Sequence, residues 1–170
     1  TAGAIAGSTF TAPGRFNAVL WQGESRELLE TPDSFNSAAA DISPNGEYIG
    51  GVVTFEDLTL FETINQPAVW SNGELTRLED ADGNAFRGRV AAVSDNGFAV
   101  GESSDGRGFI WHESFVGVRL MDEWLLTEFG LTVPSVILSV TDVYFDGVTL
   151  TFAVTGTNGL IQTPVPRSAR

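Results

Sequence analysis

The acidic stretch 79–84 contains the residue types that could hold a metal ion. Asp80, Asp82 and Asn84 place oxygen ligands at every second position around Gly83, and hard oxygen ligands on a tight turn suit Ca²⁺. The distal bidentate glutamate of an EF-hand loop is not at the required spacing, and Asp, Gly and Asn are also ordinary turn residues. Asp80, Asp82 and Asn84 are therefore a candidate calcium site, but the sequence favours a simple turn. It indicates no other cofactor.

Side chains for acid–base or nucleophilic catalysis are scarce. The chain has one histidine, His112, and no cysteine, so the usual nucleophile–base pairs cannot be assembled. His112 follows an expected strand, and we interpret it as a surface turn residue. Glu123 and Glu128 could form the carboxylate pair of a glycosidase, but 22 acids in 170 residues form pairs by chance. We expect no enzymatic activity and rank a glycosidase last.

Charge and hydropathy exclude two classes of partner. The net charge is -13, and all nine basic residues are arginine. Nucleic acids and anionic lipids are bound through cationic contacts, so neither is an expected partner. The apolar stretches are shorter than the roughly 20 residues of a membrane-spanning helix, so we expect no membrane insertion. Because Thr1 stands in place of a methionine, we expect a removed leader or an excised fragment.

One pattern occurs three times along the chain. It comprises an apolar strand ending in tryptophan, a polar turn, a leucine-containing strand, a strand of small residues, an Asn-Gly or Asp-Gly turn and a further apolar strand. Trp21, Trp70 and Trp111 mark the copies, and each is expected to pack between units. We divide a single domain, residues 1–170, into units 16–65, 66–106 and 107–158, with terminal strands in 1–15 and 159–170.

Each unit is predicted to be a four-stranded antiparallel blade of a β-propeller-like, all-β fold, because short runs rich in Val, Ile, Phe and Trp alternate with turns. Four Asn-Gly or Asp-Gly pairs are predicted to be two-residue hairpin turns. These pairs begin at Asn45, Asn72, Asn96 and Asp146.

The terminal strands of this arrangement need partners, because an unpaired sheet edge promotes aggregation. They could pair with each other and close a ring of about four blades. Alternatively, they could pair with another copy and give a dimeric ring or a polymer. The sequence does not decide between these routes.

Two segments depart from the repeat. Residues 121–129 place Met121, Trp124, Leu125 and Leu126 near one helical face before Gly130, which predicts a short helix that could plug an end of the ring. The insert 54–65 alternates polar and apolar residues, which predicts an extra hairpin or an exposed arm. Its candidate contact residues are Phe55, Leu58, Leu60 and Phe61. The apolar character of these four residues would be explained equally well if their side chains were buried.

The repeated order of segments resembles the bacterial extracellular HAF-repeat family. The resemblance rests on residues 18–21 (AVLW), 38–43 (AAADIS), 45–46 (NG) and 48–51 (YIGG), with their counterparts in the later units, and covers almost the whole chain. No copy keeps the His-Ala-Phe triplet: the matching positions are Asn17 to Val19, Gln66 to Ala68 and Gly108 to Ile110. The resemblance implies export and a propeller-like repeat fold, and it supplies no catalytic motif.

The leading functional hypothesis is an exported structural or adhesion-type repeat module, located outside the cell or on its surface, that self-associates or binds another extracellular protein or glycan. The alternative is a propeller that binds a glycan or peptide on one face. The sequence leaves open the partner, the organism, the way any ring closes, and whether a longer precursor supplied more blades.

Overall fold

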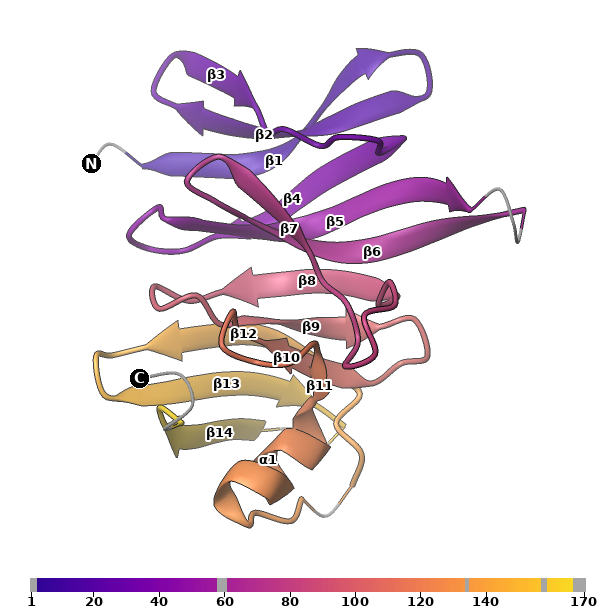
Figure 1. The fold of residues 1–170 in the computed structure, drawn as a ribbon. Coiled ribbons are helices and arrows are strands. Elements are labelled where there is room, and N and C mark those ends of the chain that lie inside the picture. The colour runs from indigo at the N-terminus through magenta and orange to yellow at the C-terminus, as the bar shows by residue number, and fades with distance from the viewer. Residues whose placement is uncertain (1–2, 58–60, 134, 157–158, 167–170) are drawn as a thin grey trace.

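The computed structural model describes residues 3–57, 61–133, 135–156 and 159–166. Its strands form four antiparallel sheets, numbered here from sheet 1 to sheet 4 along the chain, and the described residues include one α-helix. The sheets are stacked one on another in chain order, and sheets 1 and 4 lie at opposite ends of the stack (Figure 1). The all-β prediction with one short helix is confirmed at this level.

The first two sheets differ by one strand. Sheet 1 contains β1 (Ala4–Ala12), β2 (Arg15–Gln22) and β3 (Ser25–Leu28), in that order. Sheet 2 contains β4 (Asn36–Ile42), β5 (Tyr48–Asp57), β6 (Glu62–Ser71) and β7 (Glu74–Arg77). The two ten-residue strands β5 and β6 extend beyond their neighbours as a two-stranded ribbon, so the described parts of the insert, 54–57 and 61–65, belong to a hairpin extension (Figure 1).

The remaining sheets show the same difference. Sheet 3 contains β8 (Gly88–Val93), β9 (Ala99–Ser103), β10 (Gly108–Trp111) and β11 (Arg119–Leu120). Sheet 4 contains β12 (Ser139–Phe145), β13 (Thr149–Thr155) and β14 (Gly159–Pro164). The helix α1 (Met121–Phe129) lies between β11 and β12 in the chain.

The sheets do not coincide with the units drawn from the sequence, which corrects the expectation that each unit is one four-stranded blade. Unit 16–65 supplies β2 and β3 to sheet 1, and β4, β5 and the start of β6 to sheet 2. A sequence repeat is defined only up to a cyclic shift, because every starting point gives the same period. In the structure a complete sheet begins with the strand of small residues and ends with the leucine-containing strand.

Equivalent strands are identified by register. Ile5 lies opposite Trp21, as Ile49 lies opposite Trp70 and Ala99 opposite Trp111. We call β4, β8 and β12 the leading strands, and β1, β5, β9 and β13 the second strands. The tryptophan strands are β2, β6 and β10, and β14 has their place in sheet 4. Among the described residues, sheet 1 has no leading strand and sheet 4 has no strand beyond β14.

Every leading strand carries a β-bulge at the same place. The pairing with the second strand shifts between Ala39 and Asp41, between Val90 and Ala92, and between Val140 and Asp142. After the first bulge, the Asp41 carboxylate accepts a hydrogen bond from the N–H of Val93 in the next sheet, at 2.9 Å. Bulges therefore direct a side chain from one sheet towards its neighbour.

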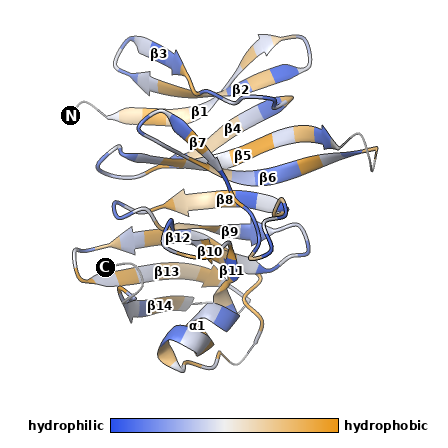
Figure 2. Ribbon diagram, in the orientation of Figure 1, coloured by the Kyte–Doolittle hydropathy of each residue, from blue (hydrophilic) through white to orange (hydrophobic). Residues whose placement is uncertain are grey.

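Hydrophobic residues occur along the strands of all four sheets (Figure 2). The buried apolar side chains form clusters between consecutive sheets, which is where burial stabilises the stack. Trp70 is 1 % exposed between sheets 1 and 2, and its indole N–H donates to the Glu30 carbonyl at 2.9 Å. Trp111 packs beside the core between sheets 2 and 3. The prediction that tryptophans pack between units holds for these two residues.

The four predicted turns are of more than one kind. Asn72 and Gly73 both have positive φ, 53° and 82°, as a two-residue type I′ hairpin requires. At Asn45-Gly46 and Asn96-Gly97, positive φ is confined to the glycine, and the hairpins are longer. At Asp146 the central pair is Gly147-Val148, because the Asp146 N–H bonds the Thr149 carbonyl.

The helix prediction is confirmed over Met121–Phe129, with Gly130 in the left-handed conformation at its C-terminus. Met121, Trp124 and Leu125 are buried between sheets 3 and 4, whereas Leu126 is 53 % exposed and does not share that face. The helix packs against the side of the stack instead of plugging a ring.

The described sheets form an open stack in which β1 and β14 belong to opposite ends and do not pair (Figure 1).

Candidate functional site

The predicted contact residues on the β5–β6 ribbon have different environments. Phe55 is half-buried, and the Arg77 guanidinium lies over its ring at 5.7 Å. Phe61 is 94 % exposed beside the ribbon tip. Leu58 and Leu60 lie outside the described residues. The ribbon therefore offers one strongly exposed aromatic side chain, and Phe55 contributes to the structure of the ribbon's base.

The calcium candidate forms a turn that uses its own carboxylate. One Asp80 oxygen accepts the backbone N–H groups of Asp82 and Asn84, both at 2.9 Å, and the Asn84 side-chain amide also donates to it. The hydrogen bonds from Asn84 hold the pKa of Asp80 below its ordinary value. Across the described part of the chain, no three His, Cys, Asp or Glu side chains gather as a metal-binding group.

His112 is buried, which corrects its interpretation as a surface residue. It is 8 % exposed and stacks on Phe98 with ring centroids 4.5 Å apart. Its Nε2 lies 3.1 Å from the Asn96 carbonyl, and its Nδ1 lies 3.2 Å from the Ser114 N–H, which donates to it. Burial lowers the pKa of His112. The ring is held by these contacts as a buried group beside sheet 3.

We expect the protein to lose stability as the pH falls through the ordinary histidine range. The unfolded chain binds a proton at His112 near pH 6.5, whereas the folded chain binds it at a lower pH, so acid favours unfolding. Urea midpoints at pH 7.5 and pH 5.5 would measure this difference, and His112→Gln should reduce it. An unchanged difference in that variant would assign the effect to other groups.

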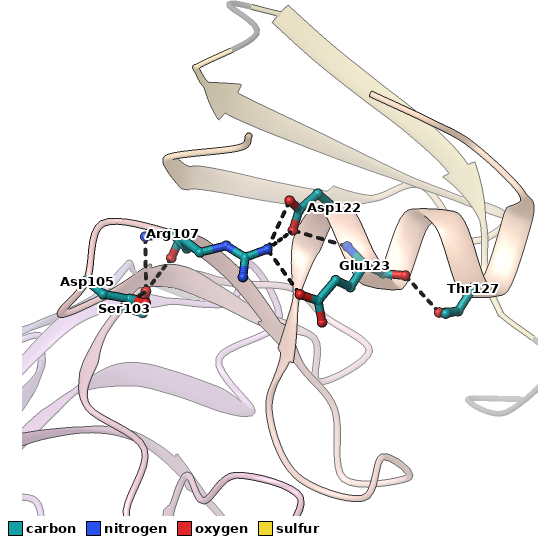
Figure 3. Close-up of polar contacts among 6 residues, drawn as sticks. All are labelled: Ser103, Asp105, Arg107, Asp122, Glu123 and Thr127. Carbon is teal, nitrogen blue, oxygen red and sulfur yellow. Dashed lines mark hydrogen bonds and ion pairs between the residues drawn. The ribbon is translucent and has the colours of Figure 1, made fainter. Parts of the chain in front are cut away.

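The carboxylates considered for glycosidase chemistry each face an arginine. Arg107 donates to both oxygens of Asp122, at 2.8 and 3.0 Å, and to Glu123 at 3.1 Å (Figure 3). Glu128 pairs with Arg119 at 2.9 Å. Asp122 and Glu123 lie in the first turn of α1, where negative charge is favoured. These pairs join the helix to sheet 3 and hold both glutamates in structural contacts.

A groove of about 510 Å³ lies between sheets 2 and 3, at the base of the ribbon. Its lining includes the polar side chains of Thr54, Asn65, Arg89 and Glu102, with Phe16 at the edge. Arg89 and Glu102 lie 3.4 Å apart, and both are substantially exposed. Such a surface could bind a polar ligand through hydrogen bonds, although no nucleophile–base pair lines it.

The outer face of sheet 1 carries a tryptophan at the position where sheets 2 and 3 place one against the preceding sheet. Trp70 and Trp111 both face the preceding sheet, and Trp21 has their register position in the first sheet of the stack. Trp21 is half-buried and lies over Gly7. Ile5, opposite Trp21, is 64 % exposed, and Leu28 on the same face is 46 % exposed.

The outer face of sheet 4 has the complementary positions. Each sheet that has a leading strand contains a row of paired residues just after the bulge, and these rows can be compared directly. The rows are Asp41–Gly50–Val69, Ala92–Val100–Ile110 and Asp142–Ala153–Leu160. Val69 and Ile110 are buried against the next sheet, at 2 % and 0 % exposure, whereas Leu160 is 73 % exposed. Asp142 has the position from which Asp41 reaches the next sheet, and it is exposed.

No family model, curated protein or solved structure matches this chain. Among the described residues, the one helix is too short to cross a membrane. The sequence analysis did not identify Leu160 or Asp142 as contact residues. The repeat could have indicated them, because Leu160 aligns with residues that are buried between sheets and Asp142 aligns with Asp41, which bonds the next sheet.

Proposed function

We propose that the protein is an exported, non-enzymatic structural or adhesion-type module that assembles by stacking the sheets of one copy on those of another. The observation that carries the proposal is that Trp21 and Leu160 have the register positions at which the internal sheets bury Trp70, Val69 and Ile110. The same proposal includes three further points: the stack continues as in a propeller, the chain belongs to the HAF-repeat family, and the protein is located outside the cell.

The proposed contact is head to tail. The outer face of sheet 4 in one copy meets the outer face of sheet 1 in the next, which repeats the internal contact between consecutive sheets. Arg26 lies opposite Trp21 on the outer face of sheet 1 and is exposed. A contact between two different surfaces generates a closed ring or an open filament, according to the rotation between copies.

The absence of cysteine from the sequence allows a direct test by engineered cross-linking. Ile5→Cys and Leu160→Cys proteins would be prepared separately, mixed and oxidised. Head-to-tail stacking predicts a covalent dimer in the mixture and little from either variant alone. Self-linking of each variant would instead indicate a two-fold symmetric contact. A mass of 18.1 kDa by light scattering at every concentration would exclude self-association.

Changing Trp21 is expected to weaken assembly strongly. A central aromatic contact contributes roughly 2 kcal/mol or more to association, so Trp21→Gln should raise the dissociation constant about 30-fold or more. Analytical ultracentrifugation would measure it, with circular dichroism to confirm folding. Phe61→Ser is the matched control, because Phe61 is 94 % exposed on the ribbon, away from both faces. A larger effect of Phe61→Ser would make the ribbon the contact site.

A second candidate function is glycan or peptide binding in the groove between sheets 2 and 3. The polar lining from Thr54, Asn65 and Arg89 favours it. A glycan array probed with the protein and with Asn65→Ala would test this function. Binding that is lost in the variant supports the groove, and equal binding by both proteins places any glycan elsewhere.

A further inference from the structure

The edge of β1 that does not face β2 occupies the position at which other sheets receive a leading strand. β5, β9 and β13 each pair with a leading strand on one edge and with a later strand on the other. β1 is their equivalent, because its register against β2 matches that of β5 against β6. Within the described residues, no strand pairs with the other edge of β1.

Gly7 gives a second, independent observation. Its equivalents Gly51 and Gly101 are glycine where the leading strand approaches closely: an added Cβ would lie 2.1 Å from the Ala38 carbonyl oxygen and 2.0 Å from that of Arg89. In sheet 4, Val154 has this position, so the sheet itself does not demand glycine. At Gly7 an added Cβ would lie 3.1 Å from the Trp21 ring, a tight contact with a side chain that can shift, and it would meet no backbone atom within 4 Å.

The surroundings of this edge also match those of a paired second strand. β4 lies against β1 and β2 as β8 lies against β5 and β6. In sheet 2 the carbonyls of Tyr48 and Thr54 accept N–H groups from the residues flanking β4. Ala4 and Phe10 have the same register in β1, so their carbonyls are directed to the open edge.

We propose that the open edge of β1 is a strand-accepting site that binds an extended segment as an added leading strand. The segment it fits has the leading-strand pattern of small residues with an aspartate after a bulge, as in residues 36–43. Main-chain hydrogen bonds would provide the binding free energy, and small side chains would permit the close approach at Gly7. This inference goes beyond the proposed function, since it pairs an edge instead of stacking two faces.

The test uses the full chain and a synthetic peptide with the sequence of residues 36–43. Amide shifts of ¹⁵N-labelled protein would be followed up to millimolar peptide, which detects weak binding. We expect saturable shifts along β1, in particular at Ala4, Ala6 and Ser8. The absence of saturable shifts, or shifts confined to other strands, would overturn the proposal.

Two variants make the test specific for the edge. By register Ser8 matches Val52, so its N–H faces the open edge, where proline is tolerated but cannot donate. Ser8→Pro should weaken binding about tenfold or more, and Ser8→Ala should leave it unchanged. If Ser8→Pro does not fold, a peptide with proline in place of Ala38 should lose binding to the unchanged protein. The proposal is overturned if the Ser8→Pro protein or the proline peptide binds as tightly as its unchanged counterpart. If peptide binding weakens as the protein concentration rises, a second copy of the protein competes for the edge.

Discussion

Replacing Trp124 by alanine is expected to lower the free energy of unfolding by about 3–5 kcal/mol. Trp124 is fully buried, and its ring lies 5.2 Å from that of Phe129 and 5.8 Å from that of Phe152, so it joins the helix to sheet 4. Its Nε1 has no hydrogen-bond partner among the described residues, and the loss of that buried donor offsets part of the cost. Urea unfolding followed by circular dichroism would measure the change.

Leu126→Ala is the matched control on the same helix. Leu126 is 53 % exposed, so its truncation should change the free energy of unfolding by about 0.5 kcal/mol or less. Similar losses in the two variants would mean that the helix contributes little as a link between sheets 3 and 4. A small loss at Trp124 alone would mean that the sheets repack around the cavity.

The elements of this fold could be predicted from the sequence because each has a local cause. Runs of β-branched and aromatic residues between turns gave the strands, and Gly130 after Phe129 gave the end of the helix. The boundaries of the sheets could not be predicted, because periodicity is the same for every cyclic shift. The two-residue turn was identified at Asn72-Gly73, but the same type of pair at Asn45 occurs in a longer hairpin.

The candidate sites were harder to predict than the fold, because burial depends on which sheet lies at each end of the stack. His112 follows a tryptophan strand and stacks on Phe98, which comes from an earlier segment of the chain, while Phe115 of its own loop also lies against it. Trp21 was expected to behave as Trp70 does, yet no described sheet lies on its outer side. The exposure of Leu160 follows from the same cause at the other end.

Gly101→Ala is expected to destabilise the protein by about 2 kcal/mol or more, because the added Cβ would lie 2.0 Å from the Arg89 carbonyl oxygen and 3.0 Å from the Phe109 ring. The entropy that alanine removes from the unfolded chain, about 0.4–1 kcal/mol, offsets a smaller part. Denaturant unfolding of the variant measures the net change. Gly159→Ala is the control, since its Cβ meets nothing within 4 Å, and it should be neutral or slightly stabilising.

The comparison with Gly7→Ala separates two reasons for a glycine at this register. Gly7 lies in the same row of its sheet as Gly101, but an added Cβ there contacts the Trp21 ring, which can move, instead of a backbone carbonyl. We expect Gly7→Ala to cost less stability than Gly101→Ala and to weaken peptide binding at the β1 edge. A large loss of stability with unchanged peptide binding would mean that Gly7 is kept for the packing of Trp21 and not for an approaching strand.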